Sequence, residues 1–166
     1  MRIRNVQCDK KHSERILNQV GDRALFHKRQ CSRRLALQAM YQWHLTDEDA
    51  KTLVIQYQED EYWPKSDPAY FSELVLGSIK QSDVIDENIN GVSEYSVDKI
   101  DPIELAALRV ATYELINCVQ IPEKVITSEA IRLCKKFGSD EGFKLVNVVL
   151  DKLMKKFDRK LMLQQS

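Results

Sequence analysis

The feature that most constrains the fold is the spacing of apolar residues, which recur every three or four positions from about residue 68 onward. Pro68, Pro102 and Pro122 each open such a run, at the helix position where the missing proline N–H is not needed. Asp67 and Asp101 precede two of these prolines as N-cap residues. No alternating apolar and polar pattern bounded by hairpin turns competes with this spacing. The sequence therefore predicts an all-α fold.

The predicted architecture is a compact bundle of six or seven helices in one domain over residues 25–160. We expect two small three-helix subdomains, at about 27–95 and 97–160, with one long helix following Pro68 in the first. Gly138 is predicted to end a helix in the left-handed conformation, and Ser139 to cap the next one. Residues 1–24 are polar and lack helical periodicity, so they are predicted to form a mobile arm.

Charge is distributed unevenly, although the formal net charge is zero. Residues 1–34 carry 10 Lys/Arg against 3 Asp/Glu, whereas residues 35–104 carry 4 against 15. Residues 105–166 carry 11 against 7. The summed field of each region would steer a partner of opposite charge to its own surface. This distribution favours an acidic partner at the N-terminal end and a basic partner in the middle.

Composition and motifs argue against several classes of protein. No run of about 18 apolar residues and no signal-peptide core is present, which predicts a soluble cytoplasmic protein with no membrane partner. The 4 cysteines show no metal-ligand spacing and are expected to be free thiols. The 3 histidines form neither a metal nor a triad pattern, and no glycine-rich loop could hold a phosphate. We therefore expect no cofactor, no metal and no enzymatic activity.

The stretch "HKRQCSRRLALQAMYQWHL", residues 27–45, carries the functional signal. At 100° per residue, its alanines, Leu35, Met40 and Trp43 form one apolar face about 140° wide. Tyr41 points about 170° away from the centre of that face, on the same side as Arg34 and Gln38. The helix is thus predicted to expose a tyrosine together with basic and amide side chains.

Three interpretations of this polar side remain open. A solvated basic helix start is the simplest, but cations at a helix N-terminus oppose its dipole. A membrane-surface helix would place its aromatic residues on the apolar side. Single-stranded RNA fits better, because cations neutralise phosphates while aromatic and guanidinium planes stack on unpaired bases. The candidate RNA-binding residues here are Lys28, Arg29, Arg33, Arg34, Gln38 and Tyr41.

The segments "RRLALQAMYQWHL", "LAALRVATYEL", "IPEKVITSEAIRLCKKFG" and "FKLVNVVLD" together resemble the NusB family of transcription antitermination factors. The resemblance covers about residues 25–158 and implies an all-helical protein. It also implies binding of boxA RNA in nascent ribosomal RNA transcripts, together with the small-subunit ribosomal protein NusE, in the antitermination complex of RNA polymerase. It assigns a second RNA-side segment to Ser139–Lys144, including Lys144, and a partner contact to Glu104. Glu104 also stands where a capping-box glutamate would.

The chain departs from the family pattern at several positions. Gln30 and Cys31 interrupt the arginine run, Leu145 replaces a frequent phenylalanine, and Val148 replaces a usual glycine. The first 24 residues have no identified counterpart. An alternative function is a helical RNA-targeting or protein-interaction module of an RNA-modification complex, because similar helical domains occur in RNA methyltransferases. A module that binds only proteins would show no salt-dependent RNA binding.

Overall fold

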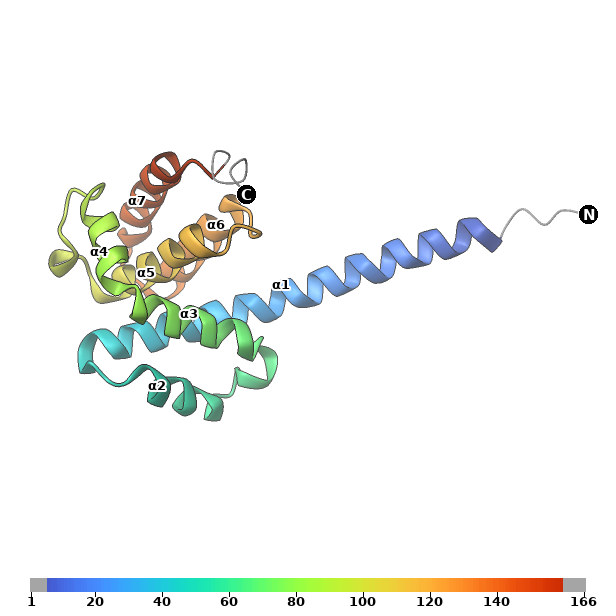
Figure 1. The fold of residues 1–166 in the computed structure, drawn as a ribbon, viewed down its shortest axis with the longest axis horizontal. Helices are drawn as coiled ribbons and strands as arrows, with labels where there is room; N and C mark the ends of the chain where they lie inside the picture. Colours follow the sequence, from blue (N-terminus) through green and yellow to red (C-terminus); the bar gives the residue numbers. More distant parts are fainter. Residues whose placement is uncertain (1–5, 160–166) are drawn as a thin grey trace, which may run out of the picture.

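The computed structural model describes the backbone of residues 6–159 and the side chains of residues 14, 15 and 17–159. Within this part of the chain there are seven α-helices, three short 3-10 helices and no strand, so the predicted all-α fold is confirmed (Figure 1). The α-helices are α1 Val6–Thr46, α2 Ala50–Gln56, α3 Pro68–Lys80, α4 Ser82–Asn90, α5 Pro102–Asn117, α6 Glu123–Phe137 and α7 Gly142–Phe157.

Helix α5 forms the centre of the fold and contacts α1, α3, α4, α6 and α7. Its residues from Glu104 to Leu115 are all buried, so it has no solvent-facing stripe. Asp101 caps its N-terminus, accepting a hydrogen bond from the backbone N–H of Ile103 at 3.0 Å. Pro102 occupies the first turn, as the sequence predicts. Because α5 is buried all round, the helices that pack on it are held in one shared core.

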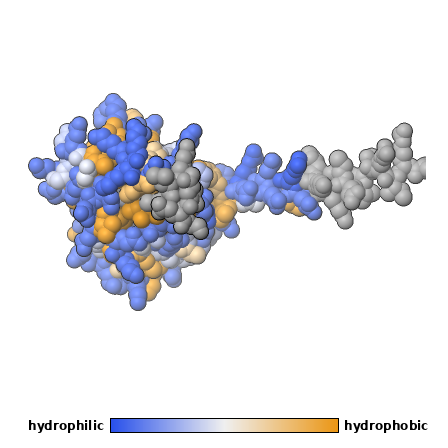
Figure 2. Space-filling model, turned by 45° about the horizontal axis from the view of Figure 1, so that its top comes forward, coloured by the Kyte–Doolittle hydropathy of each residue, from blue (hydrophilic) through white to orange (hydrophobic). Residues whose placement is uncertain are grey.

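The first part of α1 is helical, although residues 6–24 lack the apolar periodicity of a helix and were expected to form a mobile arm. Figure 1 shows this part projecting away from the bundle, and Figure 2 shows that its coloured portion next to the bundle is mostly hydrophilic. Side chains from Gly21 to Lys28 are exposed. The helix has no proline here, and the packed part of α1 supplies a nucleus from which each added residue gains one hydrogen bond. A helix can therefore continue without an apolar periodicity of its own. Residues 1–5 of the predicted arm lie outside the described residues.

The long helix predicted after Pro68 is divided into α3 and α4 by a break at Gln81. Gln81 leaves the helical conformation, with φ −102° and ψ 16°, and ends one helix while starting the next. Its side-chain amide exchanges two hydrogen bonds with Asn117 at the end of α5, at 3.2 and 3.1 Å. The change of direction lets Ile85 and Ile89 on α4 enter the core. The contacts with α5 therefore stabilise a break in the helix, although the apolar periodicity continues across it.

Candidate nucleic-acid interface

A groove of about 530 Å³ runs along the C-terminal half of α1, and we call it the tyrosine groove. Its volume falls in the range of ordinary ligand sites. Gln38 and Tyr41 lie on one wall, while Tyr57, Ile103 and Phe137 come from the 3-10 helix η1 (Tyr57–Glu59), from α5 and from α6. The lining also includes Leu37, Gln42, Leu45 and Thr46. Two predicted RNA-binding residues therefore share a concave, largely apolar surface that also carries side-chain amides.

Tyr41 is half-buried, whereas the sequence predicts an exposed ring. The difference arises because Tyr57 and Phe137 approach the polar side of α1 and supply apolar walls there. Burial and the charge of Asp60 raise the pKa of the Tyr57 hydroxyl to about 12, so this hydroxyl is neutral and can donate. It donates to Gln42 at 3.4 Å. The side chains of Tyr41 and Tyr57 are therefore both available to a ligand bound in the groove.

Arg34 lies beside this groove with its guanidinium held between two aromatic rings. The guanidinium carbon is 3.9 Å from the ring centroid of Tyr62 and 5.1 Å from that of Phe137. Both distances are within the range of cation–π attraction. Because Phe137 also lines the tyrosine groove, the predicted residues Arg34, Gln38 and Tyr41 lie on one surface.

Further cations and rings continue this surface on both sides of Arg34. Lys65 lies 5.1 Å from the ring centroid of Tyr62, and Lys136 lies 5.5 Å from that of Phe137. Lys135 lies 4.7 Å from the ring centroid of Phe143. Alternating cations and aromatic faces are the arrangement that binds a single strand, through phosphates and stacked bases respectively. We call Arg34, Tyr62, Lys65, Lys135, Lys136, Phe137 and Phe143 the cation–aromatic cluster.

Most members of the cation–aromatic cluster were not predicted from the sequence. Tyr62 and Lys65 belong to the "EDEYWPKSDP" loop, whose role the sequence leaves open. Phe137 and its two preceding lysines form the end of α6, in the "CKKFG" segment. The signal that could have found them is the adjacency of lysine and aromatic residues in both segments.

Arg33 is buried, so its prediction as an RNA contact is wrong. Only 2% of the residue is exposed. Its Nη2 lies 2.7 Å from Oε1 of Glu114 on α5, and its Nε donates to both carboxylate oxygens. Nη2 also donates to the hydroxyl of Tyr70 at 3.1 Å. Burial by itself would lower the pKa of Arg33, but its hydrogen bonds and charge interaction with Glu114 raise it. This ion pair ties α1 to α5 and α3.

The two predicted residues before Arg33 occupy different positions. Lys28 is exposed on the projecting part of α1. Arg29 is half-buried, with its guanidinium carbon 4.8 Å from the ring centroid of Tyr70. Neither residue lines the tyrosine groove. Lys28 and Arg29 therefore remain candidate phosphate contacts at one end of the surface, separate from the residues that form the groove.

Glu104 is also buried, with 1% exposure, so a direct contact of its side chain with a partner is contradicted. Its Oε1 accepts hydrogen bonds from the backbone N–H and the hydroxyl of Ser139, at 2.9 and 2.8 Å. The predicted capping box is wrong too, because Glu104 caps the turn between α6 and α7 instead of its own helix. A side chain at Gly142 would overlap its carboxylate.

The turn between α6 and α7 differs from the prediction in its backbone. Gly138 has φ −87°, so it is not left-handed, and α7 begins after Glu141 without a side-chain cap. Ser139 is held by Glu104 and does not cap α7. Lys144, in the first turn of α7, is exposed and pairs with Glu141. Lys144 therefore stays a candidate phosphate contact beside the end of α6.

The described residues contain no group of histidine, cysteine and acidic side chains that could hold a metal ion. Cys31, Cys118 and Cys134 are free, as predicted for thiols without partners. Burial, followed by nearby carboxylates, raises the pKa of both Cys118 and Cys134 to about 12, so neither is a reactive thiolate. Over the same part of the chain, no helix is long and apolar enough to cross a membrane.

Comparison with known proteins gives a consistent assignment. The family model described as "NusB family" matches residues 30–155. The transcription antitermination protein NusB of Pseudomonas fluorescens is 40% identical over 126 residues, which cover 76% of this chain and 76% of that protein. The NusB of Coxiella burnetii is 38% identical over 122 residues, covering 74% and 88%. Among solved structures, NusB of T. maritima superposes with a TM-score of 0.68 at 25% identity, covering 76% of this chain and 89% of that one.

Proposed function

The chain belongs to the NusB family, and from this premise we propose that it acts in transcription antitermination as a non-enzymatic, RNA-binding adaptor. In this proposal it binds boxA-type RNA of nascent ribosomal RNA transcripts together with the small-subunit ribosomal protein NusE. The pair then joins the antitermination complex of RNA polymerase. The observation that carries the RNA-binding part is the cation–aromatic cluster beside the tyrosine groove.

The chemistry of this surface favours single-stranded RNA over a folded duplex. An aromatic side chain can stack only on a base that has left its own stack, which single strands allow. Tyr41 provides such a ring in the groove, and the amide of Gln38 can both donate to and accept from a base edge. Lys65 and Lys136 stand beside the rings as exposed cations for the phosphates. Arg34 contributes a planar cation between two rings.

The proposed place for NusE is the acidic surface next to the tyrosine groove. Residues 35–104 carry 15 Asp/Glu against 4 Lys/Arg, which suits a basic ribosomal protein. Glu59 and Asp60 line a smaller hollow that also includes Gln38, so a partner bound there would lie close to RNA in the groove. Glu104 is buried and holds the α6–α7 turn, so in this proposal its side chain does not contact the partner directly.

The test measures fluorescence anisotropy of a short labelled boxA-type RNA, with and without NusE, over a series of salt concentrations. Tyr41→Ala should weaken RNA binding by about 1–3 kcal/mol, the usual contribution of one stacked base. Tyr41→Phe should retain most of the affinity, because the ring is kept. Since the ring is half-buried, Tyr41→Ala should lower the free energy of unfolding by about 2 kcal/mol, less than a full aromatic core truncation.

Lys155→Ala is the matched control for loss of a cation, because Lys155 is exposed in the last turn of α7. It should leave RNA binding unchanged, whereas Lys136→Ala should weaken binding and reduce its salt dependence. Glu59→Lys should reduce the gain in affinity that NusE provides and spare binding of RNA alone. Equal RNA affinity for Tyr41→Ala, Lys136→Ala and the wild type, in folded proteins, would exclude this surface as the RNA site.

A further inference from the structure

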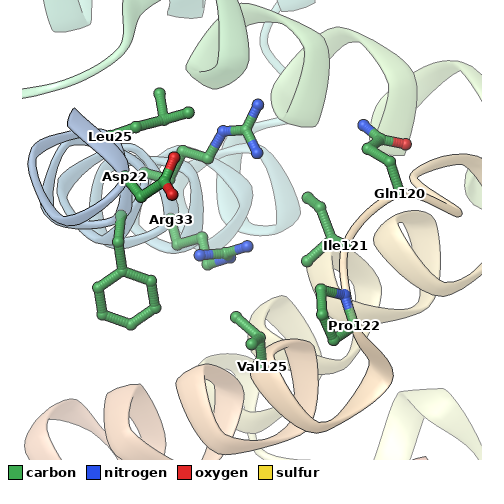
Figure 3. A pocket seen from close by; sticks show the side chains of 9 residues that line it. Asp22, Leu25, Arg33, Gln120, Ile121, Pro122 and Val125 are labelled. Carbon is green, nitrogen blue, oxygen red and sulfur yellow. The ribbon is translucent and has the colours of Figure 1, made fainter. Parts of the chain in front are cut away.

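A second groove lies where α1 leaves the bundle, between α1 and the start of α6. Figure 3 shows Leu25 and Arg33 on the α1 side facing Gln120, Ile121, Pro122 and Val125. Its volume of about 180 Å³ would hold about six waters, at roughly 30 Å³ of liquid volume each. The lining also includes Asp22, Phe26 and Arg29. We call it the α1–α6 groove.

The walls of the α1–α6 groove are mainly apolar and incompletely covered. Leu25 is 41% exposed and Phe26 is 40% exposed, although both face apolar residues of the loop before α6. Covering these two side chains would remove further apolar area from water, which is favourable at about 25 cal/mol per Å². An apolar segment would therefore be stabilised in this groove.

The chain itself passes the rim of the groove at the end of α7. Asp158 adopts the left-handed conformation, with φ 38°, and ends the helix. Arg159 then turns into the bundle with only 6% exposure. Its guanidinium donates to the carbonyl oxygens of Leu115, Ile121 and Glu114, at 2.9, 2.6 and 2.6 Å. Because Ile121 also lines the α1–α6 groove, the side chain of Arg159, the last described residue, reaches the edge of this groove.

We propose that residues 160–166 dock in the α1–α6 groove and hold the projecting part of α1 against α6. The segment reads KLMLQQS, with three consecutive apolar residues directly after Lys160. At 3.3–3.6 Å per extended residue, its 7 residues span at most about 24 Å, and the segment follows Arg159, whose guanidinium binds the groove residue Ile121. Leu161 and Leu163 cover the apolar walls, and Lys160 complements the exposed carboxylate of Asp22.

The structure also offers polar partners for the end of this segment. The Nε of Arg29 and the Nη1 of Arg33 are buried and have no hydrogen-bond partner among the described residues. Both residues line the groove. Gln164 and Gln165 carry amide oxygens that can accept from the Nε of Arg29 after a small shift of its side chain. The composition of the segment thus matches an apolar groove with guanidinium groups at one side.

The test uses methyl-labelled full-length protein in solution and two double variants of equal charge. In the wild type we expect nuclear Overhauser cross-peaks from the methyl groups of Leu161 and Leu163 to those of Val125. The variant Leu161→Asp/Leu163→Asp should lose them, and amides from Leu25 to Lys28 should then exchange with solvent about tenfold faster. The control Val84→Asp/Val148→Asp adds the same charge at two exposed apolar positions outside the groove and should keep the cross-peaks.

Two results would overturn the proposal. One is the absence of these cross-peaks in the wild type together with the same amide exchange in both double variants. The other is cross-peaks seen only between differently labelled molecules in a mixed sample, which would mean that the groove is filled by a second copy. RNA affinity is not the readout, so a failed RNA-binding proposal leaves this test unaffected.

Discussion

Replacing Arg33 tests the most consequential difference between sequence and structure, since the residue lies in the core and not on the binding surface. Arg33→Ala removes three hydrogen bonds to Glu114, which is itself only 1% exposed. A buried carboxylate left without its partner typically costs 3–5 kcal/mol, so we expect a loss of about 4 kcal/mol in the free energy of unfolding. This is a large fraction of the 5–15 kcal/mol that stabilises a typical domain.

Arg34 provides the matched control, because it is the same residue type at the next position. Among the described residues its guanidinium contacts two aromatic rings and no carboxylate, and a half-buried cation–π contact contributes about 1–2 kcal/mol, between the exposed and the fully desolvated cases. Arg34→Ala should therefore lower stability by no more than about 2 kcal/mol while weakening RNA binding. Urea unfolding followed by circular dichroism, with anisotropy for the RNA, separates the two effects.

A double variant distinguishes loss of the ion pair from loss of volume. Replacing Arg33 and Glu114 together by methionine leaves no unpaired charge, and such exchanges of a buried pair are often close to neutral. We expect Arg33→Met/Glu114→Met to be more stable than either single variant. If Arg33→Ala instead unfolds within about 1 kcal/mol of the wild type, and its RNA binding is both weaker and less dependent on salt, the ion pair is not structural and Arg33 belongs to the RNA site.

Two further predictions concern other buried groups. Gly142→Ala should destabilise the protein by about 1–3 kcal/mol, because the added methyl group overlaps the carboxylate of Glu104 beneath the α6–α7 turn. At Gly21 an added methyl group meets no atom within 4 Å, so Gly21→Ala should stabilise its helix by up to about 1 kcal/mol. Urea unfolding of both variants measures this, and stabilisation by both would contradict the packing. Because the pKa of Cys118 and Cys134 is about 12, iodoacetamide at pH near 8 should label Cys31 before Cys118 and Cys134, which should react only after unfolding. Peptide mapping follows these three cysteines separately, and equal labelling rates for them in the folded protein would refute the burial of Cys118 and Cys134.

Much of the fold could be predicted because its signals are local. Asp67 and Asp101 cap their helices as expected, since an N-cap needs only its own side chain and the next turn of backbone. The break at Gln81 could not be predicted in the same way. It is stabilised by hydrogen bonds to Asn117, a residue on another helix, and sequence periodicity contains no information about that contact.

The wrong prediction for Arg33 has a different origin, because the helical periodicity already indicates that this residue lies on the buried face of α1. With Leu35 as zero, the same 100° per residue places Arg33 at about 160°, next to Met40 at about 140° on the apolar face. Glu114 is likewise a charged residue among the apolar, buried positions of α5. A charged residue at an apolar position, with an opposite charge at another, is the pattern of a buried pair. Because Arg33 lies among other basic residues, it was grouped with the exposed arginines.

The tyrosine groove could be predicted only in part, because its far wall comes from segments distant in the sequence. Gln38 and Tyr41 follow from the helical angle, but Phe137 lies about a hundred residues later and reaches the groove only through the packing of α6. Glu104 shows the same limitation. Its position suggests a capping box, yet its hydrogen-bond partner is Ser139, 35 residues away.

Two neighbouring arginines on α1 have different roles: Arg33 stabilises the core, and Arg34 belongs to the proposed RNA-binding surface. Arg33 fixes the rotation of α1 about its own axis, because its buried hydrogen bonds to Glu114 allow one orientation. Tyr41 follows eight residues later, about 12 Å along the same helix, so its direction depends on that rotation. A variant of Arg33 that still folds can therefore lose RNA affinity without any contact between Arg33 and RNA. Such a loss should fall equally on RNA and on any other ligand of the tyrosine groove, whereas loss of a phosphate contact would change the salt dependence of RNA binding alone.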